Sequence, residues 1–256
     1  MKKIVVKVGS DVVVKEGKLA LRRMAHVCES LGILHASGYR VLLVSSGAIA
    51  CGKMAVVGYN HASVIDKATA ATFGQGDLIR YYKIFFHINN FPVGQLLLSH
   101  DQLHDSLLRN HILGMIIRAW ESHGIMIANG NDGVNPDEVQ LDNDMLARML
   151  AEFVDAQAFI VLSMHQGLYT ADPTYAHEAD FVATVPHITQ EVLAYASSTQ
   201  SPNGAPGGMR TKLLQIQRAT QAGIPCYLAA WNADLLNVLA GKAGTFFPPQ
   251  EKEVVK

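Results

Sequence analysis

The feature that most constrains the fold of this chain is an alternation of short apolar runs with longer amphipathic stretches. Runs rich in branched and leucine side chains, mostly ended by Gly, Ser or Asn, are typical of buried strands. They are Ile4–Val8, Arg40–Ser45, Ile125–Ala128, Phe159–Ser163 and Pro225–Ala229. Apolar residues spaced by three and four between these runs predict helices. The helical stretches are Leu19–Ser37, Lys67–Asn89, Ser106–Ser122, Asn143–Phe153 and Thr211–Ala222.

This alternation predicts an α/β fold, a three-layer αβα sandwich with an open, mainly parallel central sheet. A chain of 256 residues can bury a large core as one domain. We expect that domain over residues 1–247 and a short charged tail over 248–256. Ligands of such sheets bind outside the carboxyl ends of the strands, so the loops that follow the strands are where a site is expected.

Composition and charge narrow the function classes. The formal net charge is −1 and no Lys/Arg block occurs, which argues against nucleic acid as a partner. The N-terminus lacks the pattern of a signal peptide, and no apolar run approaches the length of about 20 residues that spans a bilayer. We therefore expect a soluble, cytoplasmic protein with no membrane partner. The three cysteines lie far apart and the histidines have no metal-ligand spacing, so we expect reduced thiols and no protein-built metal site.

Two loops after predicted strands suit an anion. Lys7-Val-Gly-Ser10 places a lysine beside a glycine turn, where backbone N–H groups can approach an anion closely. Ser45-Ser-Gly-Ala48 runs from a strand into a helix start, whose exposed N–H groups suit a carboxylate or phosphate. Taken alone, the first loop fits a purely structural role better, and the second fits one equally well.

Three further segments make a binding site the better explanation. Asn129-Gly-Asn-Asp132 follows a strand, and Asp142-Asn-Asp144 comes soon after it, with Asp144 expected to open a helix. Taken alone, an aspartate there would be a helix cap. Gly207-Gly-Met-Arg-Thr-Lys212 puts glycines before a helix whose first turn carries a lysine, an arrangement that supplies N–H donors and a cation to a phosphate.

In order, the strings VKVGS, VSSGAIACG, KATAATFGQ, VGQLLLS, NGND, LDNDMLA, GLYTADP, GGMRTKL and AGTFF resemble the glutamate 5-kinases of the amino-acid-kinase family. The resemblance covers about residues 4 to 247 and implies the amino-acid-kinase fold, with a mainly parallel eight-stranded sheet. It also implies ATP-dependent phosphorylation of the γ-carboxylate of glutamate, with ATP and Mg²⁺ bound.

The resemblance assigns roles position by position. Lys7 and Lys212 match the two lysines that flank the transferred phosphoryl group, and Asp144 matches the aspartate that holds them. The glutamate-binding positions are matched by Ser46, Gly47, Asn129, Asp132 and Asn143. The ATP-binding positions are matched by Lys7, Gly9, Ser10, Ser163, Met164, Tyr169, Pro206, Gly207, Gly208, Met209 and Lys212.

Four positions depart from the family pattern. Gly130 stands where a glutamate is usual, and Met164 where an aspartate is usual. Pro206 replaces a threonine in the glycine loop, and Asp11 replaces a serine or threonine near the expected phosphates, where its charge is unfavourable unless it points away. The chain could therefore phosphorylate glutamate with weakened nucleotide contacts, act on another small carboxylate or phosphate, or bind a ligand without catalysis.

The resemblance also implies partners. It suggests proline as a feedback inhibitor, a glutamyl phosphate reductase that takes the product of this first step of proline synthesis, and a dimer or tetramer of the chain. Tyr81, Tyr82, Phe85 and Phe86 on one helical stretch fit either core packing or an oligomer contact. Many family members carry an added RNA-binding-type PUA domain for which this sequence has no room, so the resemblance is to the form without it.

Overall fold

The computed structural model describes residues 1–134, 142–176, 178–196 and 208–250. Its main sheet has seven strands among these residues, in the order β11-β10-β7-β1-β4-β6-β5. All neighbouring strands are parallel except β10 and β11. The strands are β1 (Lys2–Val8), β4 (Tyr39–Ser45), β5 (Val93–Leu98), β6 (Ile125–Gly130), β7 (Ala158–Ser163), β10 (Cys226–Ala230) and β11 (Thr245–Phe247).

The five strands expected from the sequence are present, and the fold class is confirmed. The eight-stranded sheet that the resemblance implied is seven-stranded in the described part of the chain. Two of the seven, β5 and β11, were not expected from the residue pattern. Two small antiparallel pairs lie outside the main sheet: β2 (Val14–Lys15) with β3 (Lys18–Leu19), and β8 (Leu168–Tyr169) with β9 (Phe181–Val182).

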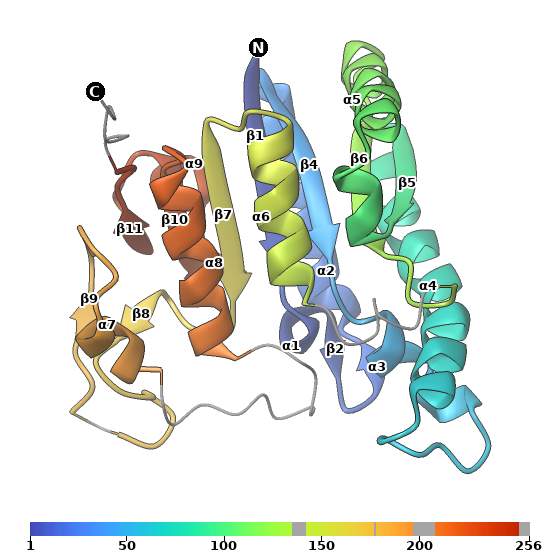
Figure 1. The fold of residues 1–256 in the computed structure, drawn as a ribbon, viewed down its shortest axis with the longest axis horizontal. Helices are drawn as coiled ribbons and strands as arrows, with labels where there is room; N and C mark the ends of the chain where they lie inside the picture. The colour runs from blue at the N-terminus through green and yellow to red at the C-terminus, as the bar shows by residue number, and fades with distance from the viewer. Residues whose placement is uncertain (135–141, 177, 197–207, 251–256) are drawn as a thin grey trace.

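Helices cover both faces of the sheet (Figure 1), as the alternation predicted. The long helices are α2 (Leu21–Ala36), α4 (Val64–His87), α5 (Ser106–Glu121), α6 (Asn143–Phe153) and α8 (Met209–Gln221). The short ones are α1 (Ser10–Val13), α3 (Ala48–Gly52), α7 (Gln190–Ala194), α9 (Leu235–Leu239) and the 3₁₀ turns η1 (Lys53–Ala55) and η2 (His100–Leu103). Gly38 adopts φ 91° just after α2, a left-handed conformation in which helices commonly end.

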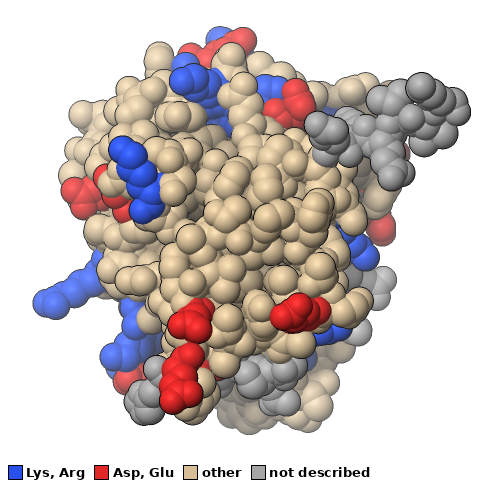
Figure 2. All heavy atoms as spheres, turned by 90° about the vertical axis from the view of Figure 1, so that its left-hand side faces the viewer, with Lys and Arg blue, Asp and Glu red and all other residues tan. Residues whose placement is uncertain are grey.

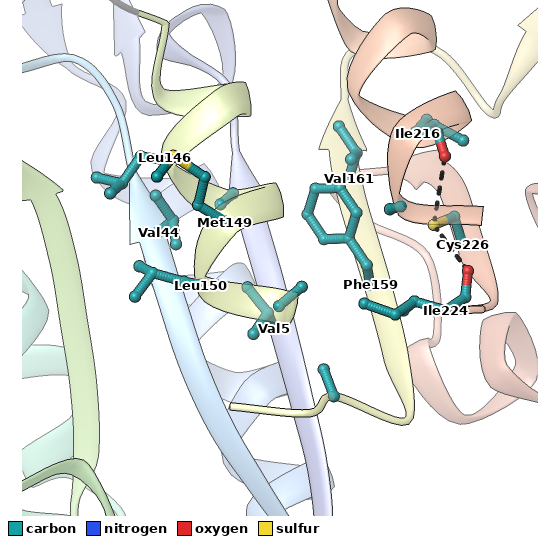
Figure 3. Packing of buried hydrophobic residues seen from close by; sticks show 14 of the residues in the cluster. Val5, Val44, Leu146, Met149, Leu150, Phe159, Val161, Ile216, Ile224 and Cys226 are labelled. Atoms are coloured by element: carbon teal, nitrogen blue, oxygen red, sulfur yellow. Dashed lines mark hydrogen bonds between the residues drawn. The ribbon is translucent and has the colours of Figure 1, made fainter. Parts of the chain in front are cut away.

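The core consists of two apolar layers, one on each face of the sheet. Along β1, Val5 belongs to the layer under α5, α6 and α8, whereas Val6 and Val8 belong to the layer under α2, α4 and α9. Figure 3 shows Leu146 of α6 near Val44 and Leu150 of α6 toward Val5, all in the first layer. Because strand side chains alternate between faces, Lys7 lies on the α6 face, like Val5.

The carboxyl ends of β1, β4, β6 and β7 lie at one edge of the sheet, where α1, β2 and α3 gather at the bottom of Figure 1. Figure 2 shows the side of the molecule formed by β9, α7 and β11, with charged side chains around a broad middle area that carries none in the part not covered by grey atoms. Among the described residues, no helix is long and apolar enough to cross a bilayer.

Candidate active site

Two lysines and one aspartate meet at the carboxyl edge of the sheet. The Asp144 carboxylate forms an ion pair through Oδ1 with the Lys7 ammonium, and its Oδ2 lies 3.8 Å from Nζ of Lys212. All three are buried, with exposures of 3% for Lys7, 0% for Asp144 and 8% for Lys212. Buried charges are tolerated when they are paired, and here one carboxylate faces two cations. The cluster therefore has an excess positive charge that an anion can neutralise.

The pKa values follow from this arrangement. Burial alone would lower the pKa of Lys7, but the Asp144 charge, with smaller contributions from Asp142 and Asp11, raises it above its ordinary value. Burial would raise the pKa of the Asp144 carboxyl, but the charges of Lys7 and Lys212 outweigh burial and hold that pKa below its ordinary value. Lys7 and Asp144 are therefore both ionised at neutral pH.

Asp144 is not the cap of α6. The N-cap is Asp142, whose Oδ1 accepts a hydrogen bond of 2.9 Å from the backbone N–H of Asp144. Asp144 lies in the first turn of α6, and its carboxylate contacts the two lysines instead of the helix backbone. Its position near the N-terminal end of the helix favours a negative charge.

Amide side chains form a hydrogen-bonded chain next to this cluster. Asn143 Nδ2 donates to Asn129 Oδ1 at 2.8 Å, and Asn129 Nδ2 donates to Gln75 Oε1 at 2.8 Å. The backbone N–H of Gly130 donates to both asparagine oxygens, at 2.9 Å to Asn129 and 3.3 Å to Asn143. Sequence reasoning missed Gln75 as a site residue, although it ends the KATAATFGQ string, because helical periodicity gives a half-buried glutamine no particular role.

The other residues expected on the acceptor side lie at the same edge. Ser46 and Gly47 follow β4, and Gly47 has φ 104°, a conformation that favours glycine, directly before α3. Asp132 lies half-buried in the loop after β6. The Oγ of Ser45, the last residue of β4, lies 3.0 Å from the hydroxyl of Tyr82 on α4.

The expected nucleotide residues lie toward β7 and α8. Gly9 donates its N–H to Leu162 O at 3.4 Å, which joins the β1 loop to the end of β7. The Ser163 hydroxyl donates to His165 O at 3.1 Å and accepts from the His165 N–H at 3.3 Å. Gly208 is the N-cap of α8, and its N–H donates to Thr211 Oγ1 at 2.9 Å.

A largely apolar pocket lies beside these loops. Its lining residues come from the β7–β8 loop, from β8 and the segment after it, from the end of α7 and from the start of α8: His165, Gly167, Leu168, Tyr169, Ala171, Asp172, Pro173, Tyr195 and Met209. Tyr169 and Met209, both expected at the nucleotide, line it. Ser10 begins α1 at the same edge. Pro206 and Gly207 lie outside the described residues.

The structure shows the surroundings of two of the four residues that differ from the family pattern, Asp11 and Met164. Asp11 does not point away from the site, because its Oδ1 would lie 3.2 Å from a Cβ added at Gly9 in the loop after β1. Its backbone carbonyl and the Met164 sulfur both accept from Arg23 Nη1, at 2.8 and 3.1 Å. Arg23 therefore links the two altered positions on the nucleotide side.

Comparison with solved structures identifies the fold. The chain resembles a carbamate kinase from Giardia lamblia bound to AMP-PNP, with a TM-score of 0.66, 17% identity and coverage of 97% of this chain and 99% of that one. It also resembles a UMP kinase from Ureaplasma parvum, with a TM-score of 0.67, 14% identity and coverage of 96% and 98%. The fold is thus one used by kinases of small molecules.

Comparison with known sequences identifies the family. Residues 2–230 match the model of the amino acid kinase family, and the chain belongs to that family. A glutamate 5-kinase from Clostridium tetani (strain Massachusetts / E88) is 35% identical over 254 residues, which is 96% of this chain and 94% of that protein. A glutamate 5-kinase from Syntrophus aciditrophicus (strain SB) is 34% identical over 99% of this chain and 67% of its own length. Within the family, the chain groups with the glutamate 5-kinases.

Proposed function

We propose that this chain transfers the γ-phosphoryl group of ATP to the γ-carboxylate of L-glutamate, giving ADP and L-glutamyl 5-phosphate, the first step of proline biosynthesis. The observation that carries the proposal is the convergence of Lys7 and Lys212 on Asp144 at the carboxyl edge of the sheet. The family membership and the curated glutamate 5-kinase relatives support it.

The transfer needs charge neutralisation and alignment more than proton transfer. The γ-carboxylate of glutamate is already ionised at neutral pH, so no general base is required. A carboxylate oxygen attacks the γ-phosphorus, and the bond from that phosphorus to the oxygen it shares with the β-phosphate breaks, leaving the negative charge on ADP. Lys7 and Lys212 stabilise the charge on the moving group, and Asp144 holds the two ammonium groups at fixed positions.

The acceptor glutamate lies against the amide chain of Asn129 and Asn143, with Ser46, Gly47 and Asp132 around it. Amide N–H groups and the backbone N–H groups at Gly47 suit its carboxylates. The nucleotide lies toward β7 and α8, with Gly9, Ser10, Ser163 and Gly208 near the phosphates and the pocket of Tyr169 and Met209 beside the base. The ATP roles of Met164, Pro206 and Gly207 stay proposals from the resemblance.

Mg²⁺ fits this site as an ion carried by the nucleotide. Among the described residues no group of three or more His, Cys, Asp or Glu could hold a metal ion. Mg²⁺ is commonly bound by one or two carboxylates together with substrate phosphates, and Asp142, whose Oδ2 is buried without a hydrogen-bond partner, is the carboxylate beside the lysine cluster that would hold it. When bound, Mg²⁺ supplies positive charge to the β- and γ-phosphates.

The test is an ATP-consumption assay with a panel of amino acids, in which hydroxylamine traps any acyl phosphate as a hydroxamate. We expect hydroxamate with glutamate and at most a trace with aspartate or N-acetylglutamate. Hydroxamate with another acid and none with glutamate would move the chain to a different substrate. Stabilisation by glutamate without ATP consumption would make it a binding protein.

We further propose a cytoplasmic homo-oligomer, inhibited by proline, whose product is consumed by a glutamyl phosphate reductase. Tyr82 and Phe86 are fully buried, so they do not support an oligomer contact. Support comes instead from four exposed apolar side chains on α4 and next to its end: Ile65, Phe73, Ile84 and Ile88. Light scattering with and without proline tests the oligomer and its response.

A further inference from the structure

Helix α4 contacts both loops that the proposed acceptor glutamate would touch. Tyr82 reaches the end of β4 through the hydroxyl of Ser45, at 3.0 Å. Gln75 reaches the end of β6 through Asn129, at 2.8 Å. The two α4 residues are seven apart, so they lie on the same face of the helix. One face of α4 thus contacts both the end of β4 and the end of β6.

The position of Gln75 along α4 is fixed by a close contact between α4 and α3. A Cβ at Gly74 would lie 2.0 Å from the carbonyl oxygen of Ala48, and a Cβ at Gly52 would lie 1.9 Å from that of Ala70. Helices α3 and α4 therefore touch backbone to backbone, which only glycine at these positions allows. Since Ala48 directly follows the Ser46–Gly47 loop, the residue after Gly74 is fixed relative to that loop.

The direction of the hydrogen bonds in the amide chain is set by a backbone N–H, which can only donate. The backbone N–H of Gly130 donates to Asn129 Oδ1, so this oxygen must face Gly130. The Asn129 nitrogen then faces α4, where Gln75 Oε1 accepts from it. Asn129 is 1% exposed, so without Gln75 this nitrogen would lose a hydrogen bond that water could not easily replace.

With this polarity, Asn129 Oδ1 also accepts from Asn143 Nδ2, at 2.8 Å. Each asparagine nitrogen uses one of its two N–H groups within the chain, and its second N–H is directed elsewhere. The chain of amides is therefore ordered so that it keeps N–H donors, which suit an anionic ligand.

We propose that Gln75 is a positioning residue for the acceptor substrate. Its Oε1 holds the Asn129 amide against the Gly130 N–H, and through Asn129 Oδ1 it holds the Asn143 amide, so that the half-buried Asn143 presents an N–H donor to a carboxylate of the acceptor. This inference rests on the proposed function, since it takes the amide chain as the acceptor side of the site. Gln75 acts through Asn129 and takes no part in charge neutralisation at the lysines.

The test is a KM-against-kcat comparison of the full-length protein carrying Gln75→Met. Loss of one hydrogen bond in the amide chain is worth about 1 kcal/mol, so we expect the KM for glutamate to rise roughly fivefold. The KM for ATP should stay within about twofold, because the nucleotide lies at the other strand ends. Gln157→Met makes the same chemical change at an exposed position before β7 and should leave both KM values unchanged.

A double-mutant cycle separates positioning from a general structural role. If Gln75 acts through Asn129, then Gln75→Met should add less than about twofold to the KM for glutamate when Asn129→Ala is already present. Gln75→Ala serves as a second variant with the same expectation, and the KM for ATP reports in every sample whether the protein is folded. Equal effects of Gln75→Met in both backgrounds would overturn the positioning role.

Failure of this inference and failure of the proposed function give different results. If the unmodified protein forms no hydroxamate from glutamate, the proposed function is wrong and the acceptor role of Gln75 fails with it. If the unmodified protein is active on glutamate and Gln75→Met leaves its KM unchanged, only the role of Gln75 is wrong. A rise in the KM for ATP as large as that for glutamate would also overturn it.

Discussion

Asp144 Oδ2 lies 3.8 Å from Nζ of Lys212, while Oδ1 of the same carboxylate pairs with Lys7. One carboxylate thus gives one oxygen to each of two cations from different elements, β1 and α8. This sets the spacing between the ammonium groups without neutralising both. An anion that enters the site completes the charge balance, which is the property that phosphoryl transfer requires.

Removing either lysine should lower turnover. We expect Lys7→Ala and Lys212→Ala each to lower kcat about 10²- to 10³-fold, the effect typical of losing one group that stabilises transition-state charge. Hydroxamate formation with saturating glutamate and ATP measures this. Lys2→Ala, at an exposed position on the same strand, is the matched control and should be neutral. Full turnover in either active-site variant would remove that lysine from the mechanism.

Asp144→Asn should destabilise the fold as well as the reaction. The substitution leaves Lys7 and Lys212 buried without their counter-charge, and breaking a buried ion pair in this way costs about 3–5 kcal/mol. Urea unfolding measures the loss. Asp77→Asn, on the exposed side of α4, should change the free energy of unfolding by less than about 0.5 kcal/mol. Equal stability of the two variants would contradict the role of Asp144 as the common partner.

Two glycines on α4, Gly74 and Gly76, allow a matched pair of alanine substitutions. Gly74→Ala places a Cβ 2.0 Å from the Ala48 carbonyl oxygen, and it should destabilise the protein by roughly 1–3 kcal/mol as α3 and α4 are forced apart. It should also raise the KM for glutamate, because α3 begins directly after Gly47. At Gly76 an added Cβ would meet no described atom within 4 Å, so Gly76→Ala should stabilise the helix by about 0.5–1 kcal/mol. Thermal melts of both variants decide the prediction, and similar shifts would refute it.

His35 should make stability depend on pH. Burial, followed by the charge of Arg40, lowers the pKa of this ring below its ordinary value of 6.5 in the folded protein. The unfolded chain therefore takes up a proton before the folded protein does, and the stabilisation present above about pH 6.5 is lost as the pH falls below it. The melting temperature should drop more between pH 7.5 and 5.5 for the unmodified protein than for His35→Phe.

Two further observations complete the His35 test. The ring packs edge-on against Phe91, with centroids 4.9 Å apart, so a phenylalanine at position 35 retains an aromatic contact. His87→Gln, at an exposed position on α4, should show the same pH dependence as the unmodified protein. An identical drop in the unmodified protein and in His35→Phe would assign the pH dependence to other groups.

Asp11→Ser should improve binding of the nucleotide. The Asp11 carboxylate lies against the Gly9 loop, with Oδ1 3.2 Å from where a Cβ at Gly9 would be, so it adds a negative charge beside the proposed triphosphate position. Its removal should lower the KM for ATP about 2- to 5-fold, as expected for one partly screened repulsion. Asp66→Ser, at the start of α4, tests whether removing one negative charge elsewhere is enough to lower the KM for ATP. An increase in the KM for ATP would mean that Asp11 helps to hold the nucleotide.

Residue periodicity predicted the parallel core of the fold and missed its ends. The central strands are buried on both faces and form continuous apolar runs, whereas β5 contains a glycine and alternates in burial, and β11 has only three residues. Sequence motifs named both lysines and Asp144, but the cap of α6 is Asp142, because either aspartate fits the local pattern and only the backbone geometry decides. The orientations of the Asp11 and Gln75 side chains depend on contacts between elements that are distant in sequence, and no local pattern encodes these contacts.

The last strand of the sheet, β11, affects the order in which parts of the protein can fold during synthesis. Thr245 Oγ1 accepts from the N–H of Leu168 at 2.8 Å and donates to Val182 O at 2.6 Å, and thereby fastens the β8–β9 hairpin that carries Tyr169. On the ribosome, β1, β4, β6 and β7 are available long before Thr245 emerges, since synthesis runs from the N-terminus. The wall next to the proposed adenine position therefore gains this anchor only after Thr245 has been synthesised, long after Lys7 of β1.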